Sequence, residues 1–368
     1  MELNIFHLDT FERLGIIDEF QLLEITTNYK KHSELELLVS ATEENIDYFI
    51  ANNDDIFLTA GIGKVRGYII DSVKYTDEKK TTIEVYCKSL SSMLGWRQID
   101  GQQTFRGNVE EVIRNFVNTN AIAPTNINRK IDNLILGILS GITETTEESY
   151  TNKELDESLW EICVKFDIAY EIFANITNKR FEFIVWRGTD RSTEQTIRDA
   201  VIFSKEFDNV LSQNYTDDKS DYRNTVIIAG EGEGTTRTYL VVGNENKGRK
   251  RREMFVDARD LQSSESDQTK MSQSAYEALL KERAKNKQAE YARVQSFETD
   301  IVYDSQFKFG IDYFMGDMIT IRNDDISVAL HTRIVTTKEK YSRKGYELST
   351  EFGSNVPTLL NKIKKAVK

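Results

Sequence analysis

The last third of the sequence carries the stretch Ala229-Gly230-Glu231-Gly232-Glu233-Gly234, which closes a strand predicted at 225–229. A strand that ends in alternating glycines predicts a tight turn or bulge, because glycine adopts the positive φ angles that such turns need. The spacing does not suit a dinucleotide-binding loop, because the third glycine comes one position early and no apolar helix follows. The two glutamates would also oppose a pyrophosphate. The stretch therefore predicts a strand and a tight turn suited to building a barrel.

Charged segments follow this turn. They are Arg237, a basic run at 247–252 and the segment 253–261, and they precede a helix predicted at 272–295 whose charge density indicates a solvated surface. The basic run is compatible with phosphate binding, but the acidic balance of the chain favours a solvated loop or an ion-pairing interface for it. The polar segment at 263–270 predicts a loop.

The composition limits the class of protein. The length of 368 residues predicts two or three domains. The formal net charge of −12 predicts a surface that repels nucleic acid and anionic membranes. Cys87 and Cys163 are isolated, so we expect neither a disulfide framework nor a thiolate metal site. No secretion signal and no apolar run of roughly 18–20 residues occurs. We therefore expect a soluble chain made in the cytosol, without a membrane segment.

Most of the chain has the pattern of β structure. Strands are predicted at 35–40, 67–75, 81–88, 201–203, 225–229, 318–321 and 331–335. The runs at 67–75 and 81–88 are expected to form a hairpin. No internal repeat is visible in the sequence.

The pattern changes between about 100 and 200. Apolar residues at helical spacing follow Asn108, which is a predicted N-cap. The capping-box spacing of Thr151 and Glu154 predicts the start of a second helix, and a hairpin is expected over 169–186. This part therefore predicts a small α+β unit.

The sequence contains no recognisable catalytic apparatus. His7, His32 and His331 lie far apart, without the spacing of a zinc site or of a local nucleophile motif. The glycines at 61–67 lack the ending of a phosphate loop, and 217–221 lacks the glycine of a calcium loop. We expect no catalytic residue, no cofactor and no metal, and a chain that is not an enzyme.

The order of these motifs resembles the hub, or tail-associated, protein of siphophages, a relative of the baseplate hub in contractile tails. The residues that carry the resemblance, and that we expect to have structural or interface roles, are Gly230, Gly232, Gly234, Arg237, Arg252, Asp257, Arg259, Asp260, Gly316 and Asp317. The helix at 276–291 and the segments 61–90 and 345–353 also fit. The resemblance covers nearly the whole chain and is weakest over 100–200.

The resemblance implies a mainly β fold with two tail-tube-like β-barrel domains and smaller accessory domains. The expected boundaries are a first barrel at 1–99 completed by 200–222, an α+β insertion at 100–199, a second barrel at 223–350 with a helical insertion at 263–295, and a C-terminal tail at 351–368. The insertion agrees with the change of pattern in the sequence.

The resemblance also implies a role. Three copies would form a ring in the virion tail tip that joins the six-fold tail tube and distal tail ring to the three-fold tip or fibre. The expected partners are the distal tail protein, the tape-measure protein and the tip, fibre or receptor-binding proteins, with DNA only in transit. We expect Asp and Glu to line the channel, because carboxylates repel the phosphate backbone.

Two other functions stay open. One is a cell-wall-degrading tail-associated hydrolase that uses a carboxylate pair without a local signature. The other is a host-saccharide-binding module that uses Trp96, Trp160 and Trp186 as stacking platforms, although apolar neighbours favour core packing for all three. Tail-associated proteins often continue into an enzymatic or fibre domain; the sequence ends at Lys368, and it does not tell whether such a domain was removed.

Overall fold

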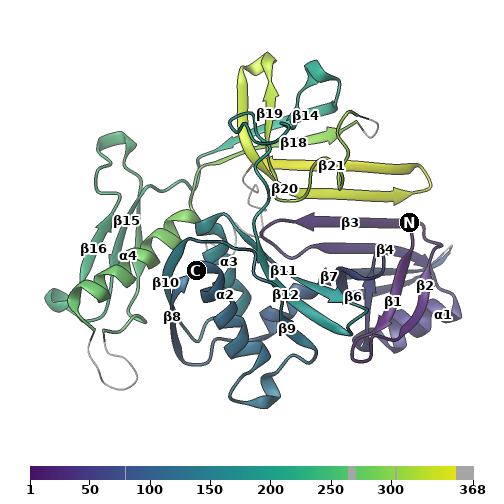
Figure 1. The fold of residues 1–368 in the computed structure, drawn as a ribbon, viewed down its shortest axis with the longest axis horizontal. Helices are drawn as coiled ribbons and strands as arrows, with labels where there is room; N and C mark the ends of the chain where they lie inside the picture. The colour runs from purple at the N-terminus through teal and green to yellow at the C-terminus, as the bar shows by residue number, and fades with distance from the viewer. Residues whose placement is uncertain (79, 264–270, 303–304, 354–368) are drawn as a thin grey trace.

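The computed structural model describes residues 1–78, 80–263, 271–302 and 305–353. Two large sheets lie one above the other, with helices and a small outlying unit beside them (Figure 1). Sixteen strands belong to one hydrogen-bonded network. The predicted mainly β architecture with an α+β insertion is confirmed.

The N-terminal sheet holds the first seven strands. These are β1 (Leu3–His7), β2 (Arg13–Ile17), β3 (Leu22–Asn28), β4 (Glu34–Ser40), β5 (Ile56–Thr59), β6 (Lys64–Asp77) and β7 (Thr81–Ser89), with α1 (Glu43–Ile46) between β4 and β5. They pair in the order β2-β1-β5-β6-β7-β4-β3. Alternate residues of β4, Leu35, Leu37 and Val39, point into one hydrophobic core. The predicted hairpin is β6–β7.

The C-terminal sheet is built from two distant parts of the chain. Its strands are β13 (Ile202–Phe203), β14 (Val210–Asp218), β18 (Val294–Ile301), β19 (Met318–Asn323), β20 (Val328–Ser342) and β21 (Gly345–Gly353). The expectation that 200–222 completes the first barrel is wrong, because β13 pairs with β19 and β14 pairs with β18. In the described part of the chain, both sheets are open rather than closed barrels: β2 pairs only with β1, and β14 only with β18.

An α+β layer packs beside the N-terminal sheet. It contains β8 (Gln102–Asn108), α2 (Val109–Val117), β9 (Leu134–Leu136), β10 (Thr145–Thr151), α3 (Leu155–Phe166), β11 (Ala169–Asn175) and β12 (Arg180–Trp186). Asn108 is the N-cap of α2, as predicted, and accepts hydrogen bonds from the amides of Glu110 and Glu111. The capping box at Thr151 is wrong. Thr151 is still part of β10, where it pairs with β8, and α3 begins only at Leu155.

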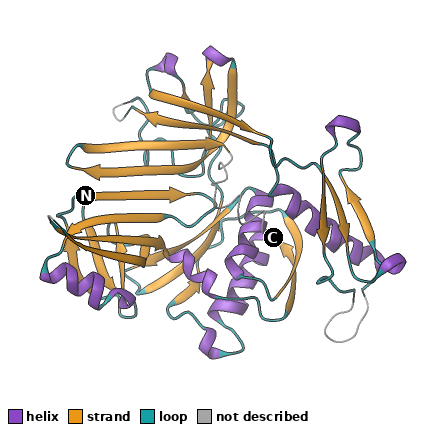
Figure 2. Cartoon of the chain, turned by 180° about the vertical axis from the view of Figure 1, so that it is seen from behind, coloured by secondary structure: helices purple, strands orange, loops and turns teal. Residues whose placement is uncertain are grey.

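A small outer unit projects from the body. It consists of β15 (Thr225–Ala229), β16 (Tyr239–Val242), β17 (Glu253–Asp257) and α4 (Gln273–Ala289). Seen from behind, α4 lies between the outer strands and the other helices (Figure 2). The expectation that 223–350 forms one barrel is therefore wrong in its first part. Among the residues that the structure describes, these strands pair only with one another and pack against α4 around a core of their own.

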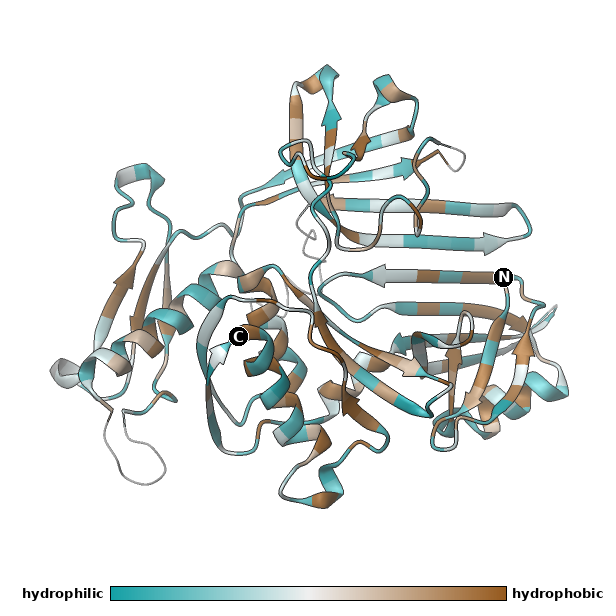
Figure 3. Cartoon of the chain, in the orientation of Figure 1, coloured by the Kyte–Doolittle hydropathy of each residue, from teal (hydrophilic) through white to brown (hydrophobic). Residues whose placement is uncertain are grey.

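Two expected segments lie largely outside the described residues: the loop at 263–270 is described only at 263, and the C-terminal tail only up to 353, where β21 ends. More and less buried residues alternate along β3 and β4, where Figure 3 shows hydrophobic and hydrophilic bands, as expected for a sheet with one buried and one solvated face. Among the described residues, no helix is both long and apolar enough to cross a membrane.

Candidate functional site

The two large sheets join at one strand pair. β3 and β20 run antiparallel, from Leu22 opposite Ser342 to Asn28 opposite Thr336. The Thr336 hydroxyl donates a hydrogen bond of 3.0 Å to Asn28 Oδ1. The pairing produces a continuous antiparallel run in the order β14-β18-β21-β20-β3-β4-β7-β6, which we call the eight-strand ladder.

The two halves of the ladder are structural repeats. The order β3-β4-β7-β6 in one half matches β14-β18-β21-β20 in the other. In each half a long strand, β6 or β20, forms a hairpin with the next strand. Each hairpin contains one register shift, between Ile70 and Ser72 or between Ile334 and Thr336, and a short strand, β5 or β19, pairs with the long strand before that shift. The matched order, hairpins and shifts make β3 the counterpart of β14, and β6 the counterpart of β20.

One face of the ladder is acidic. The residues that alternate away from the cores include nine carboxylates and four lysines. They are Glu24, Glu34, Glu36, Glu84, Asp218, Glu298, Asp300, Glu347 and Glu351, with Lys74, Lys88, Lys338 and Lys340. Some of these charges are paired, such as Lys338 with Glu24 at 2.9 Å. The face nevertheless keeps an excess of negative charge, which repels polyanions.

A cluster of charged groups ties the two sheets to the α+β layer. Asp167, just after α3, forms ion pairs with Lys30 at 2.6 Å and with Arg333 of β20. Burial opposes ionisation of Asp167, but the two cations outweigh it and lower the pKa of the carboxyl below its usual value. The Tyr29 hydroxyl donates to the Asp167 carbonyl at 3.1 Å. Sequence analysis missed this cluster, because its members come from three distant segments.

Gly316 and Asp317, two of the predicted residues, lie at the same junction. Arg333 donates a hydrogen bond of 2.8 Å to the Gly316 carbonyl. The Asp317 carboxylate is buried and accepts hydrogen bonds from the Thr189 amide at 2.8 Å and from Arg191 Nε at 3.0 Å. Asp317 therefore holds the segment after β12 against the C-terminal sheet, and Gly316 is bound to β20 beside it.

The predicted glycine turn closes β15 of the outer unit. Gly232 and Gly234 have positive φ angles of 99° and 52°, as predicted, whereas Gly230 does not. Gly230 is needed for space instead, because a Cβ there would lie 2.3 Å from the hydroxyl oxygen of Tyr276 on α4. That hydroxyl accepts a hydrogen bond of 2.7 Å from the Glu231 amide. The turn is thereby fixed to the helix behind it.

Arg237 binds the end of the same strand. Its nearly buried guanidinium donates to the carbonyls of Gly230 at 2.8 Å and Ala229 at 2.9 Å, and forms an ion pair with Asp257. Arg259 lies 3.5 Å from the other oxygen of Asp257. These side chains join the ends of β15 and β17.

The remaining predicted residues also have partners within the chain. Arg252 donates to the Lys219 carbonyl at 2.6 Å, and Asp260 lies 3.2 Å from Arg283 of α4. Arg283 also donates to the Ser149 carbonyl at 2.5 Å, which attaches the outer unit to β10. The structure thus gathers eight of the ten predicted residues in the outer unit and two at the junction; their interface role stays a prediction.

The three tryptophans differ in exposure. Trp186 packs edge-on against Tyr29 with 5.1 Å between ring centres, and Trp160 is half-buried. Trp96 is 60% exposed, so the expectation of core packing is wrong for this residue. The short helical segment that carries Trp96 places its apolar neighbours Met93 and Leu94 in the core and leaves the indole ring at the surface.

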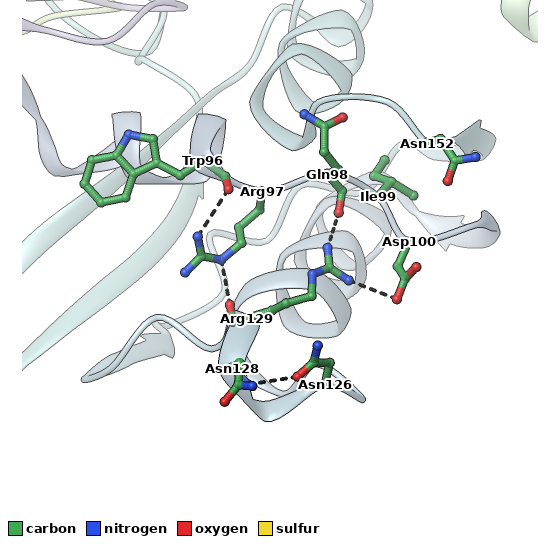
Figure 4. A pocket seen from close by; sticks show the side chains of 9 residues that line it. All are labelled: Trp96, Arg97, Gln98, Ile99, Asp100, Asn126, Asn128, Arg129 and Asn152. Atoms are coloured by element: carbon green, nitrogen blue, oxygen red, sulfur yellow. Dashed lines mark hydrogen bonds and ion pairs between the residues drawn. The ribbon is translucent and has the colours of Figure 1, made fainter.

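Trp96 borders a cavity of about 480 Å³ (Figure 4). Two arginines line this cavity, and both bind groups of the same chain. Arg97 Nε donates a hydrogen bond of 2.6 Å to the Arg129 carbonyl, and Arg129 Nη1 lies 3.1 Å from the Asp100 carboxylate. The remaining lining is mainly amide side chains, including Asn126. Saccharide binding by Trp96 stays an untested alternative.

The structure brings His32 together with a serine and an aspartate. His32 Nδ1 lies 2.9 Å from Ser91 Oγ, and Nε2 lies 3.1 Å from Asp156 Oδ2. Sequence spacing gave no signal for this cluster, because its members are 59 and 124 residues away from His32. The Ser91 hydroxyl is buried and also bonded to Ser89 Oγ at 2.9 Å. It is not presented to a substrate, and the cluster instead fixes the loop after β3 to the start of α3.

No metal centre emerges from the described residues, which contain no group of three or more His, Cys, Asp or Glu side chains arranged to hold an ion. Cys87 and Cys163 are free and buried, and burial raises the pKa of both thiols; that of Cys163 is raised to about 12.

Three solved structures with a similar overall arrangement are tail proteins. They include the 43 kDa tail protein of prophage MuSo2 from Shewanella oneidensis (TM-score 0.57, 12% identity, 96% of this chain and 98% of that one) and the tail protein from Neisseria meningitidis MC58 (0.55, 9%, 96% and 97%). The prophage tail protein gp18 from Listeria monocytogenes EGD-e is also similar (0.56, 12%, 100% and 98%). The fold is therefore that of phage tail proteins.

A family model described as Siphovirus ReqiPepy6 Gp37-like protein matches residues 2–354, and the chain belongs to this family. The resemblance to siphophage tail proteins is thereby confirmed. No curated protein matches the chain.

Proposed function

We propose that the chain is a structural hub protein of a phage or prophage tail, which forms a trimeric ring at the tail tip. Membership in a siphovirus family and the tail-protein fold support a structural role in the tail. The observation that carries the finer proposal is the structural repeat within the eight-strand ladder. Each copy contributes two similar halves, so three copies present six similar units to a six-fold tube.

The acidic face of the ladder gives the ring its inner surface in this proposal. A channel lined with this excess of carboxylates repels the DNA backbone and keeps DNA from adhering during ejection. The tape-measure protein would occupy the same channel before DNA passes. The opposite face of the ladder packs on the hydrophobic cores and the α+β layer, so it is not available to line a channel.

The proposed neighbours are the distal tail protein on one side of the ring and the tip, fibre or receptor-binding proteins on the other. The outer unit projects from the body, and its exposed residues Arg252 and Arg259 are the candidates for contact with a neighbouring chain. The proposal assigns no catalytic role to the chain. Clearing of peptidoglycan by the purified protein in a zymogram would favour the hydrolase alternative.

Mass measurement in solution tests the trimer. We expect light scattering across a concentration series to give three times the chain mass of 42.5 kDa, and negative-stain images of that species to show a ring with a central hole. Adding the distal tail protein should favour the trimer if the chain alone associates weakly. A stable dimer or tetramer, or a monomer that persists with that partner, would contradict the proposal.

A further inference from the structure

The two ends of the eight-strand ladder are open edges. In the described part of the chain, β14 pairs only with β18, and residues 70–77 of β6 pair only with β7. An open edge presents unpaired backbone N–H and C=O groups that can accept another strand. These edges are long, since β14 has nine residues and the open part of β6 spans most of its hairpin with β7.

Within the chain, one strand pairing is already equivalent to the pairing that would join these two edges. β20 is the counterpart of β6, β3 is the counterpart of β14, and β20 pairs with β3 along seven residue pairs. We infer that β6 of one copy pairs antiparallel with β14 of the next copy, in the register that β20 and β3 adopt within the chain. This inference rests on the proposed ring and names the surface through which its copies bind.

The register follows from the repeat. Ser72 and Thr336 are equivalent, because each is the first residue after the register shift in its hairpin. Counting partner by partner across each half then makes Asp218 the counterpart of Asn28. Thr336 lies opposite Asn28 within the chain. Ser72 therefore lies opposite Asp218 of the next copy, Lys74 opposite Thr216, Tyr75 opposite Tyr215, and Thr76 opposite Asn214.

The side chains suit this register. Tyr75 is 50% exposed and points to the same face of the ladder as Val73, which packs on the core. In the inferred pair it lies beside Tyr215, whose ring already packs on Phe297 with 5.0 Å between centres. On the acidic face, Lys74 lies diagonal to Asp218 of the next copy, so the pair brings opposite charges near each other; the counterpart of Glu24, the ion-pair partner of Lys338, is Asn214 on the other diagonal.

Strand direction also permits closure. All neighbours in the eight-strand ladder are antiparallel, so β14 and β6 run in opposite directions. Cyclic symmetry preserves these directions, and β6 of one copy therefore meets β14 of the next copy antiparallel. Three ladders then close without an open edge at their ends. In the described part of the chain, the other edge strands of this network, β2, β9 and β13, have no equivalent contact to set a register.

Cysteine cross-linking tests the inferred pair. We expect the full chain carrying Lys74→Cys and Thr216→Cys to form covalent dimers and closed trimers after mild oxidation, on a non-reducing denaturing gel. The matched control is Lys74→Cys with Ser212→Cys, which keeps the same face of β14 but moves the thiol four residues, or about 13 Å, along the strand. A cross-link within one chain is excluded, because β6 and β14 lie at opposite ends of the ladder. The natural cysteines Cys87 and Cys163 are buried, so they do not compete for the cross-link.

The outcomes separate the inference from the proposed function. Strong cross-linking of the first variant and little of the control supports the pair. A trimer by light scattering that does not cross-link at Lys74 and Thr216, or that cross-links equally in the control, overturns the pair and leaves the ring proposal standing. A chain that stays monomeric with its distal tail partner overturns both.

Hydrogen exchange of the unmodified protein gives a second test that does not depend on variants. We expect the amides of 71–77 and 211–218 to become at least tenfold more protected in the trimer than in the diluted monomer. Unchanged exchange in both segments on assembly would overturn the pair.

Discussion

Gly316 shows how tightly single residues hold the junction between the sheets and the α+β layer. Its φ angle is +81°, and a Cβ there would lie 2.5 Å from Tyr29 Cε2. We expect Gly316→Ala to lower the free energy of unfolding by about 3–4 kcal/mol, because backbone strain adds to a steric clash in a packed site. Urea denaturation measures the change.

Gly310 is the matched control for this prediction. It has the same φ of +81°, but a Cβ there would meet no atom within 4 Å. We expect Gly310→Ala to cost only the backbone term, about 1–2 kcal/mol. Equal losses in the two variants would show that the contacts with Tyr29 do not decide the role of Gly316.

Residue types were predictable from the sequence where the constraint is local. The glycine turn after β15 has positive φ at Gly232 and Gly234 because the turn itself needs it. Gly230 has no side chain because the Tyr276 hydroxyl, on a helix 46 positions later in the sequence, fills that space, and only the fold reveals this contact. Trp96 was misassigned to the core, because apolar neighbours in sequence do not fix which side chain of a short helical turn points outward.

At the scale of elements, Glu161 holds α3 against α4. Its buried carboxylate lies 2.5 Å from Lys153 and 2.6 Å from Lys287, which also binds Glu290 at 2.8 Å. Burial raises the pKa of Glu161, but the two lysines outweigh it and lower the pKa to about 2. A depressed pKa stabilises the folded state above the unfolded pKa of about 4.5, and this contribution is lost as pH falls toward 2.

We therefore expect Glu161→Gln to destabilise the protein by about 3 kcal/mol at pH 7, and the difference from wild type to shrink as pH falls from about 4.5 to about 2. Denaturation curves across this range measure it. The control Glu147→Gln removes an ion pair of 3.9 Å between the half-buried Glu147 and the exposed Arg106, and should change stability by less than about 0.5 kcal/mol. A Glu161→Gln deficit that does not vary with pH would contradict the electrostatic account.

Elements that depend on neighbouring sequence were predicted well, and those that depend on distant sequence were not. The β6–β7 and β11–β12 hairpins follow from alternating runs around short polar turns. The β3–β20 pairing joins segments about 300 residues apart, and no local pattern encodes such a partner. For the same reason the sequence assigned 200–222 to the wrong sheet.

At the scale of the whole molecule, the structural repeat explains why the chain has two large sheets. The repeat was invisible in the sequence, because a strand needs only alternation of buried and exposed residues, and different side chains supply it. Strand order, hairpins and register shifts retain the repeat although the residues differ. The family resemblance could be recognised from ordered motifs, whereas the acidic face became visible only when the strands were placed side by side.

We propose that three copies form a ring whose channel is lined by the acidic face of the ladder. Cryo-electron microscopy of the assembled protein would show this arrangement. We predict a three-fold ring with six similar lobes, a continuous wall of antiparallel strands, and Glu24, Glu36, Glu298 and Glu351 facing the channel. A ring that turns this face outward, or whose channel is lined mainly by Lys and Arg, would contradict the account.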